Sequence, residues 1–325
     1  MKHNAKFLVL GVVCALMSVL VAPMMAQEAD PGAGNGGLII ESNIGDDPST
    51  YIPLIGSDTT SSSIYDKFYP TIIGLDDVTL QPTPGVPQSM AAGWEYDETG
   101  TILTLNLRDD LTWSDGTPIT ADDYLWAFNA TASGEINTPR TSALYQLADG
   151  TVTDGTIHSA TKIDDFTIEF RLGTVVRDDE GSPVVGEDGQ IELAPNCEAI
   201  NDINDITPVP AHVYEPTFGE DLASMEDDPY FVPQTEGGIV GFGPFFDPFT
   251  EPGVPVSLLG NQTYSDSVLG YVAPQEWLLQ NVEDQTVAYQ RFLAGDFTTL
   301  GVSADNQNSL RASIEAGEAD FQIIE

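Results

Sequence analysis

The side chains that most often carry enzyme chemistry are scarce in this sequence. Beyond the first 26 residues there are two histidines, His158 and His212, and a single cysteine, Cys197. Neither a G-x-S-x-G nucleophile motif nor an H-E-x-x-H zinc motif occurs. A lone cysteine forms neither an intramolecular disulfide nor a cysteine-based metal site. These residue types therefore predict no catalytic residues, no resident metal and no cofactor.

Carboxylates, by contrast, are abundant. The sequence has 51 Asp and Glu against 10 Lys and Arg, which gives a net charge of −41. Paired carboxylates are the machinery of many hydrolases, so a secreted carboxylate-pair hydrolase is one alternative, although with so many acids the pairing itself is uninformative. The acidic stretch 177–192 lacks the spacing of a calcium loop and predicts an exposed hairpin. The sign of the charge excludes nucleic acid as a partner and indicates a solvated acidic surface.

The N-terminal segment has the features of a signal peptide. Lys2 and Lys6 precede an apolar run at 7–22, and Ala26 is a small residue where a signal peptidase would cleave. An uncleaved anchor is the alternative, because residues 7–26 are just long enough to span a bilayer. We therefore expect a signal peptide at 1–26 and export to the periplasm or the extracellular surface.

A glycine-rich segment, residues 27–37, follows the predicted signal peptide. Its glycines match G-x-G-x-x-G in form, but that motif binds a dinucleotide only where it follows a strand and opens a helix. Here it precedes the apolar stretch LIIES, which predicts a buried strand. The segment 27–37 is therefore predicted to be a flexible linker.

Short strands and helices are predicted beyond the linker. In TILTLNLR, Leu103, Leu105 and Leu107 alternate onto one face of a strand. The stretch LTWSDGTPITADDYLWAF, residues 111–128, predicts a strand end, a turn at Gly116 with positive φ, and a helix capped by Thr120. The side chains expected in the core are Trp113, Tyr124, Leu125 and Phe128. This alternation of strands and helices predicts an α/β fold.

Three blocks of sequence, in order, share the pattern of one protein family. They are AAGWEYDETGTILTLNLRDDLTWSDGTPITADDYLWAF at 91–128, IVGFGPFFDPF at 239–249 followed by VSLLGNQTYSD, and YQRFLAGDFTTLGV at 289–302. The chain resembles the family 5 extracellular solute-binding proteins, the oligopeptide- and dipeptide-binding components of ABC importers. It departs from the family pattern at Gly260, where an Arg is usual, and at Ser265, where an aromatic residue is usual.

The resemblance implies a fold and a function. The fold would be the two-lobed, α/β periplasmic-binding-protein-like fold of type II, cluster C. The function would be capture of a peptide or other small polar solute between two lobes, for delivery to the membrane permease of an ABC importer, by a monomer without catalytic activity. A secreted structural or adhesive β-rich protein is a further alternative, but it does not explain the three ordered blocks.

The resemblance also implies candidate ligand-binding residues. The loop GSDTTSSSIYDKF, residues 56–68, matches the loop that leads into the family's cleft. Four of its residues would present polar groups to a peptide: Asp58, Thr59, Thr60 and Ser61. The alternative is that they only cap the helix that follows. Phe242, in the G-F-G-P-F phrase, would line the hinge side of the pocket, whereas His212 resembles the core or turn histidine of the family's P-x-H-V phrase.

The length of the chain implies a division into lobes. Residues 38–271 would form most of the first lobe and 272–325 only the start of the second, because family members continue further; we therefore expect an N-terminal fragment with an incomplete second lobe. On that basis the strand near Gln275 would lack sheet neighbours. Its apolar side chains would stay unburied, namely Trp277, Leu278, Val282 and Phe292.

Overall fold

The structure is a computed structural model that describes residues 37–76, 79–249, 256–261, 264, 274–301 and 304–316. The predicted signal peptide and all but the last residue of the predicted linker lie outside these residues. Within the described part of the chain, no helix is both long enough and apolar enough to cross a membrane.

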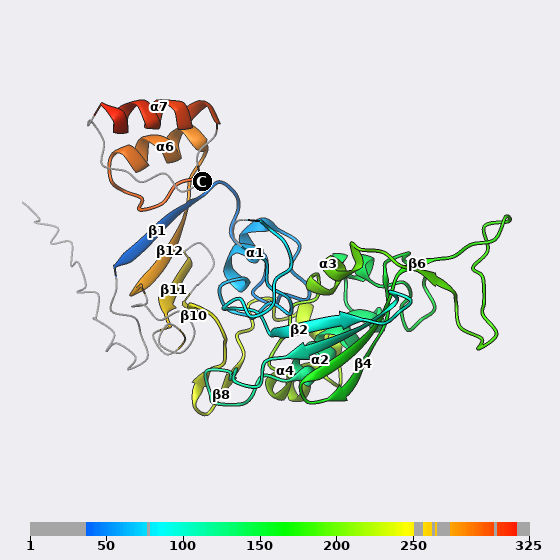
Figure 1. Cartoon of the computed structure of the whole chain (residues 1–325). Helices are drawn as coiled ribbons and strands as arrows, with labels where there is room; N and C mark the ends of the chain where they lie inside the picture. The colour runs from blue at the N-terminus through cyan, green and yellow to red at the C-terminus, as the bar shows by residue number, and fades with distance from the viewer. Residues whose placement is uncertain are drawn as a thin grey trace, which may run out of the picture. The chain divides into compact units, whose positions relative to one another are not determined.

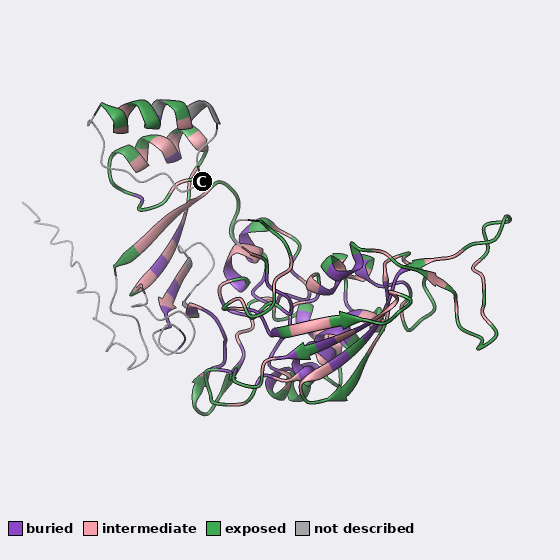
Figure 2. Ribbon diagram, in the orientation of Figure 1, coloured by how far each residue is buried: buried purple, intermediate pink, exposed green. Residues whose placement is uncertain are grey.

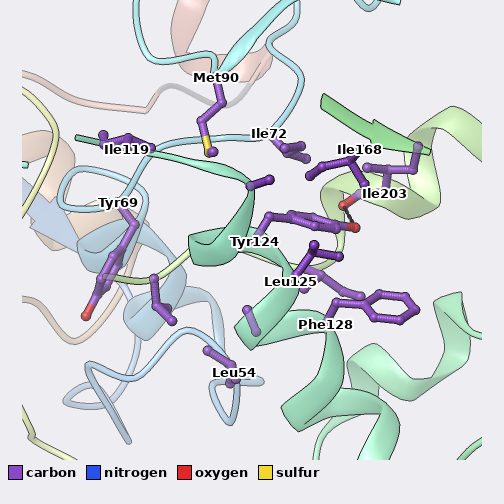
Figure 3. Packing of buried hydrophobic residues seen from close by; sticks show 14 of the residues in the cluster. Leu54, Tyr69, Ile72, Met90, Ile119, Tyr124, Leu125, Phe128, Ile168 and Ile203 are labelled. Carbon is purple, nitrogen blue, oxygen red and sulfur yellow. Dashed lines mark hydrogen bonds between the residues drawn. The ribbon is translucent and has the colours of Figure 1, made fainter. Parts of the chain in front are cut away.

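An antiparallel sheet and one long helix build the larger core. The strands run in the order β2 (Ala91–Tyr96), β3 (Ile102–Leu107), β5 (Thr167–Leu172), β4 (Ile157–Asp164). As predicted, alternate leucines of β3 are buried, with Leu103 and Leu105 fully inaccessible. Against this face packs α2 (Ala121–Ser133), whose buried side chains Tyr124, Leu125 and Phe128 are drawn in Figure 3. The ring of Tyr124 meets the ring of Phe170 edge-on at 5.5 Å. The alternation of side chains along β3 therefore decides which face of the sheet the helix covers.

The stretch 111–128 folds as its sequence predicts. Gly116 has a φ of +87°, and Trp113 is 1% exposed. The Thr120 hydroxyl accepts a hydrogen bond from the Asp122 amide at 3.3 Å, while the Asp123 carboxylate accepts one from the Thr120 amide at 2.7 Å. This reciprocal capping box satisfies N–H groups that the first turn of the helix would otherwise leave without partners.

A second sheet joins segments that are far apart in the sequence. Its order is β1 (Leu38–Asn43), β12 (Glu276–Asn281), β11 (Val256–Gly260), β10 (Phe245–Phe249), with β1 parallel to β12 (Figure 1). The prediction of a strand at LIIES is confirmed, but the prediction that it is buried is wrong: Leu38 is 42% exposed and the rest of β1 is half-buried.

The expectation that the strand near Gln275 lacks sheet neighbours is also wrong. β12 is hydrogen-bonded on one side to β1 and on the other to β11. Trp277 is 1% exposed and packs with Phe245 and Leu258, while the Trp277 indole N–H donates to the Glu41 carboxylate at 2.9 Å. The remaining apolar side chains of that expectation are half-buried, namely Leu278, Val282 and Phe292. A strand from the start of the chain covers the edge that was expected to be open; the lobe boundary at residues 271 and 272 stays a prediction.

Shorter elements complete the described structure. They are α1 (Thr59–Tyr65), η1 (Pro139–Ala143), β6 (Thr174–Val175), β7 (Leu193–Ala194), α3 (Ala199–Asn204), α4 (Ala211–Phe218), η2 (Leu222–Glu226), β8 (Gln234–Thr235), β9 (Gly238–Ile239), α6 (Gln285–Leu293) and α7 (Ala304–Glu315). The acidic stretch 177–192 connects β6 to β7 and is folded back on itself by the bridges Arg177–Pro183 and Val185–Ile191. It is largely exposed, as predicted for a hairpin (Figure 2).

Candidate functional site

The predicted ligand residues lie at the start of α1, where their polar groups bind one another. The Asp58 carboxylate accepts hydrogen bonds from the Ser61 amide and the Ser61 hydroxyl, both at 2.7 Å, and one from the Ser49 hydroxyl. Burial raises the pKa of Asp58, but these hydrogen bonds outweigh it and hold the pKa below its ordinary value. Thr60 and Ser61 are buried, and Thr59 is exposed. The structure thus shows Asp58 as the helix cap, while a role of the four residues in ligand binding stays a prediction.

A pocket of about 370 Å³ lies beside α1. None of the four predicted residues lines it, but Ser57 and Ser62, on either side of them, do. The other lining residues come from the loop before α1, from η1, and from the ends of α1 and α3 with the residues that follow them: Gly56, Tyr65, Asp66, Pro139, Arg140, Ser142, Asn204, Asp205 and Thr207. The capped start of α1 therefore positions the pocket wall without forming it.

Arg140 is the one cationic side chain among the described residues that line this pocket, and the sequence did not indicate it. It lies in η1, where the Thr138 hydroxyl accepts from its amide at 3.2 Å. Its guanidinium donates to the Gly56 carbonyl and, at 2.8 Å, to the Tyr65 hydroxyl. The buried Nε–H has no hydrogen-bond partner among the described residues. The only signal in the sequence is that a basic residue is rare in so acidic a chain.

Two carboxyl groups give the pocket its negative side. Asp66 follows the last residue of α1, and Asp205 follows the last residue of α3. Partial burial raises the pKa of both side chains, and the positive charge of Arg140 opposes that rise. The pocket therefore presents a cation, two carboxylates and serine hydroxyls to one volume, which suits a polar ligand that carries groups of both signs.

Phe242 lies in the core and not in this pocket. It is 4% exposed, and the edge of its ring packs against Tyr264 at 5.1 Å. Its amide donates to the Phe68 carbonyl at 2.9 Å. At the next residue, a Cβ on Gly243 would come within 2.2 Å of the Lys67 carbonyl oxygen, so only glycine fits that backbone path. The role of Phe242 at the hinge side of a pocket stays a prediction.

The two histidines lie in separate surroundings. His158 is on β4, where its Nε2 is 3.1 Å from the Gly173 carbonyl oxygen, and His212 is on α4, where its Nε2 is 2.9 Å from the Asp115 carboxylate. Within the described residues there is no group of three or more His, Cys, Asp or Glu side chains that could hold a metal ion. Neither histidine is among the described residues that line the pocket beside α1, so the polar groups suited to binding are those around Arg140.

Comparison with known sequences identifies the family. A sequence model described as bacterial extracellular solute-binding proteins, family 5 Middle, matches residues 86–321. The chain belongs to this family. The match runs through all three sequence blocks that suggested the resemblance, and it confirms that prediction.

Two curated proteins are similar over part of the chain. The periplasmic oligopeptide-binding protein OppA of Salmonella typhimurium is 26% identical over 137 residues, which are 41% of this chain and 24% of OppA. OppA of Escherichia coli is 30% identical over 112 residues, 31% of this chain and 19% of OppA. The matched regions thus span about a quarter or less of the length of these curated relatives.

Solved structures show the fold. AppA of Bacillus subtilis, an oligopeptide-binding protein in complex with a nonapeptide, matches with a TM-score of 0.60 at 18% identity, covering 85% of this chain and 46% of AppA. The substrate-binding protein CtaP of Listeria monocytogenes gives 0.59 at 21% identity, covering 86% and 47%. NikZ of Campylobacter jejuni, in complex with Ni(L-His), gives 0.56 at 16% identity, covering 84% and 45%. The α/β fold of a solute-binding protein is thereby confirmed.

Proposed function

We propose that this family 5 chain binds an extracellular solute, a peptide or another small polar molecule, and delivers it to the membrane permease of an ABC importer. The observation that carries the proposal is the family match over residues 86–321. We propose that the solute binds in the polar pocket beside α1. Similarity to OppA supports a peptide as the solute, because OppA is an oligopeptide-binding protein.

The pocket beside α1 offers what a peptide end requires. A peptide carries an ammonium group, a carboxylate, and amide donors and acceptors, each of which loses water on binding and needs a partner. Arg140 supplies donors, while Asp66 and Asp205 supply acceptors. We propose that Asp58, Thr59, Thr60 and Ser61 act on the ligand chiefly through the loop that they hold in place.

The remaining features of the proposal concern the form and location of the protein. We propose a non-catalytic monomer that is exported by the segment 1–26. We also propose that the boundary between its two lobes lies between residues 271 and 272. N-terminal sequencing of exported protein should then begin at Gln27. Protein that keeps residues 7–22 and fractionates with membranes would instead support the uncleaved anchor.

Calorimetry with the full chain tests the binding proposal. Trialanine and pentaalanine, titrated into wild-type protein, should bind saturably, and Arg140→Met should weaken the tighter of the two by at least tenfold. Arg108→Met is the matched control, because Arg108 is engaged with Asp110 at 2.9 Å and does not line the pocket. Unchanged affinity in Arg140→Met would place the ligand elsewhere. Failure of the folded wild type to bind either peptide would contradict a peptide as the solute.

A further inference from the structure

Arg171 on β5 is a second basic residue that lines a pocket. The sequence has 51 acidic and 10 basic residues, so carboxylates that could pair with a basic side chain are abundant. Arg108, Lys162, Arg177 and Arg291 all form such ion pairs within 4 Å. Arg171 has no such ion pair among the described residues; its one hydrogen bond runs from Nη2 to the Ile191 carbonyl oxygen. Of the five N–H donors of its guanidinium, four are therefore left without an acceptor among the described residues.

Arg171 lines a pocket of about 440 Å³ that shares no residue with the pocket beside α1. This volume lies within the range of about 300–1,000 Å³ that is typical of small-molecule sites. The pocket forms where α2, the segment 144–148 and the edge strand β4 meet, and residues 190 and 191 of the acidic hairpin close one side. Its apolar residues include Phe128, Leu144, Leu147 and Ile157.

None of the described residues that line this pocket is Asp or Glu. That composition is unusual for a chain with a net charge of −41, and it contrasts with the pocket beside α1, which includes Asp66 and Asp205. The long-range field of the other carboxylates is largely screened, because the Debye length is about 8 Å at physiological ionic strength. An anion in this pocket would meet the charge of Arg171 with no carboxylate in the wall.

A histidine and a tyrosine complete the wall. The imidazole of His158 stacks on the ring of Tyr145, with centroids 4.5 Å apart and planes at 24°. Its Nε2 is 3.1 Å from the Gly173 carbonyl oxygen, which requires the proton on Nε2 and, in the neutral ring, leaves Nδ1 as an acceptor. Burial and the nearby Arg171 charge lower the pKa of His158 and so favour this neutral ring. Nδ1 has no partner among the described residues.

We infer that this pocket is a second ligand site, for a small organic carboxylate with an apolar body. The carboxylate would pair with the free donors of the Arg171 guanidinium, which suit the two oxygens of a carboxylate. The apolar body would lie over Phe128, Leu144 and Ile157 and beside the stacked rings. The inference does not depend on the proposed uptake function, because it rests on residues of a different pocket.

Phenylacetate is the probe, and phenylacetamide, which has the same shape without the charge, is its control. Titrated calorimetrically into the full chain, phenylacetate should bind saturably, and phenylacetamide at least tenfold more weakly. Equal binding of the two, or absence of saturable phenylacetate binding, would overturn the inference. This comparison uses wild-type protein only, so it holds even if substitution of Arg171 impairs folding.

Substitutions then locate the carboxylate. Arg171→Gln should weaken phenylacetate binding by at least tenfold, and Arg177→Gln should leave it unchanged, because Arg177 is paired with Asp154 at 3.0 Å and lies outside the pocket. Arg140→Met should also leave it unchanged. Phenylacetate binding that is lost in Arg140→Met but kept in Arg171→Gln would place the anion in the pocket beside α1 and overturn the inference.

Discussion

Asp123 joins the starts of two helices, and its substitution tests how much of this fold depends on one buried carboxylate. The side chain is 3% exposed. One oxygen accepts from the Thr120 amide at 2.7 Å, at the start of α2, and the other accepts from the Ala211 amide at 2.9 Å, at the start of α4. Asp123→Ala would leave both N–H groups without an acceptor. At about 1–3 kcal/mol for each buried unsatisfied group, the expected loss is about 2–6 kcal/mol at pH 5.

The loss should depend on pH, and the sign follows from burial. Burial raises the pKa of Asp123 to about 6, although the hydrogen bonds from Thr120 and Ala211 oppose the rise. The folded state therefore binds the proton more tightly than the unfolded state, so the wild type gains stability as the pH falls through 6 towards 3.8. Between pH 7 and pH 5 this gain is about 1.3 kcal/mol for a single group, so Asp123→Ala should cost about 1.3 kcal/mol more at pH 5 than at pH 7.

Urea unfolding of wild type and variant at pH 7 and pH 5 measures the difference. Thr120→Ala is the matched control, because it removes the other half of the same capping box and titrates in neither state; it should cost about 1 kcal/mol at both pH values. Equal destabilisation by Asp123→Ala at the two pH values would refute the raised pKa. Destabilisation below about 0.5 kcal/mol at pH 5 would refute the double cap itself.

Three further substitutions test other parts of the structure. Gly116→Val should cost about 1–2 kcal/mol in thermal unfolding, because φ is +87° and no atom lies within 4 Å of an added Cβ, so the cost is backbone strain alone; a melting point equal to that of the wild type would contradict this. Asp58→Ala should cost about 0.5–2 kcal/mol at pH 7 as a lost cap. That cost should decrease as the pH falls below 3.8 and through the lower pKa that Asp58 has in the folded state; a cost that is as large at pH 2 as at pH 7 would argue against it. Trp277→Ala should cost about 3–5 kcal/mol in urea unfolding, whereas a near-neutral result would restore the expectation that this strand is unburied.

Local features of this fold were predictable because their causes lie within a few residues. The alternation of Leu103, Leu105 and Leu107 defines a buried strand face, and the T-A-D-D sequence at Thr120 defines a helix start. Gly116 is needed by its own turn. In each case the atoms that decide the conformation are sequence neighbours, so reading the sequence in short windows is sufficient.

Features that depend on distant segments were not predictable in this way. β1 and β12 pair in parallel although Asn43 and Asn281 are 238 residues apart, and the local sequence of neither strand indicates which strand it pairs with. The second hydrogen bond of Asp123, which it accepts from the Ala211 amide, was likewise not predictable, because the capping pattern already accounted for an aspartate at this position. Arg140 was missed for a related reason: its donors act on Gly56 and Tyr65, which only the tertiary fold brings near.

The acidity of the chain makes the position of each basic residue informative. An exposed ion pair contributes little to stability, about 0–1 kcal/mol, so Arg108 and Arg177 are explained by neighbouring carboxylates and require no ligand. Arg140 and Arg171 differ, because each lines a pocket and neither forms an ion pair within 4 Å among the described residues.

The surroundings of Arg140 and Arg171 favour different ligands. Two carboxyl groups beside Arg140 favour a ligand with charges of both signs, such as a peptide end, whereas the carboxylate-free wall around Arg171 favours a ligand that is anionic only. Trialanine and phenylacetate should therefore bind without competing, and mutual displacement at one site would show that the two pockets are not independent.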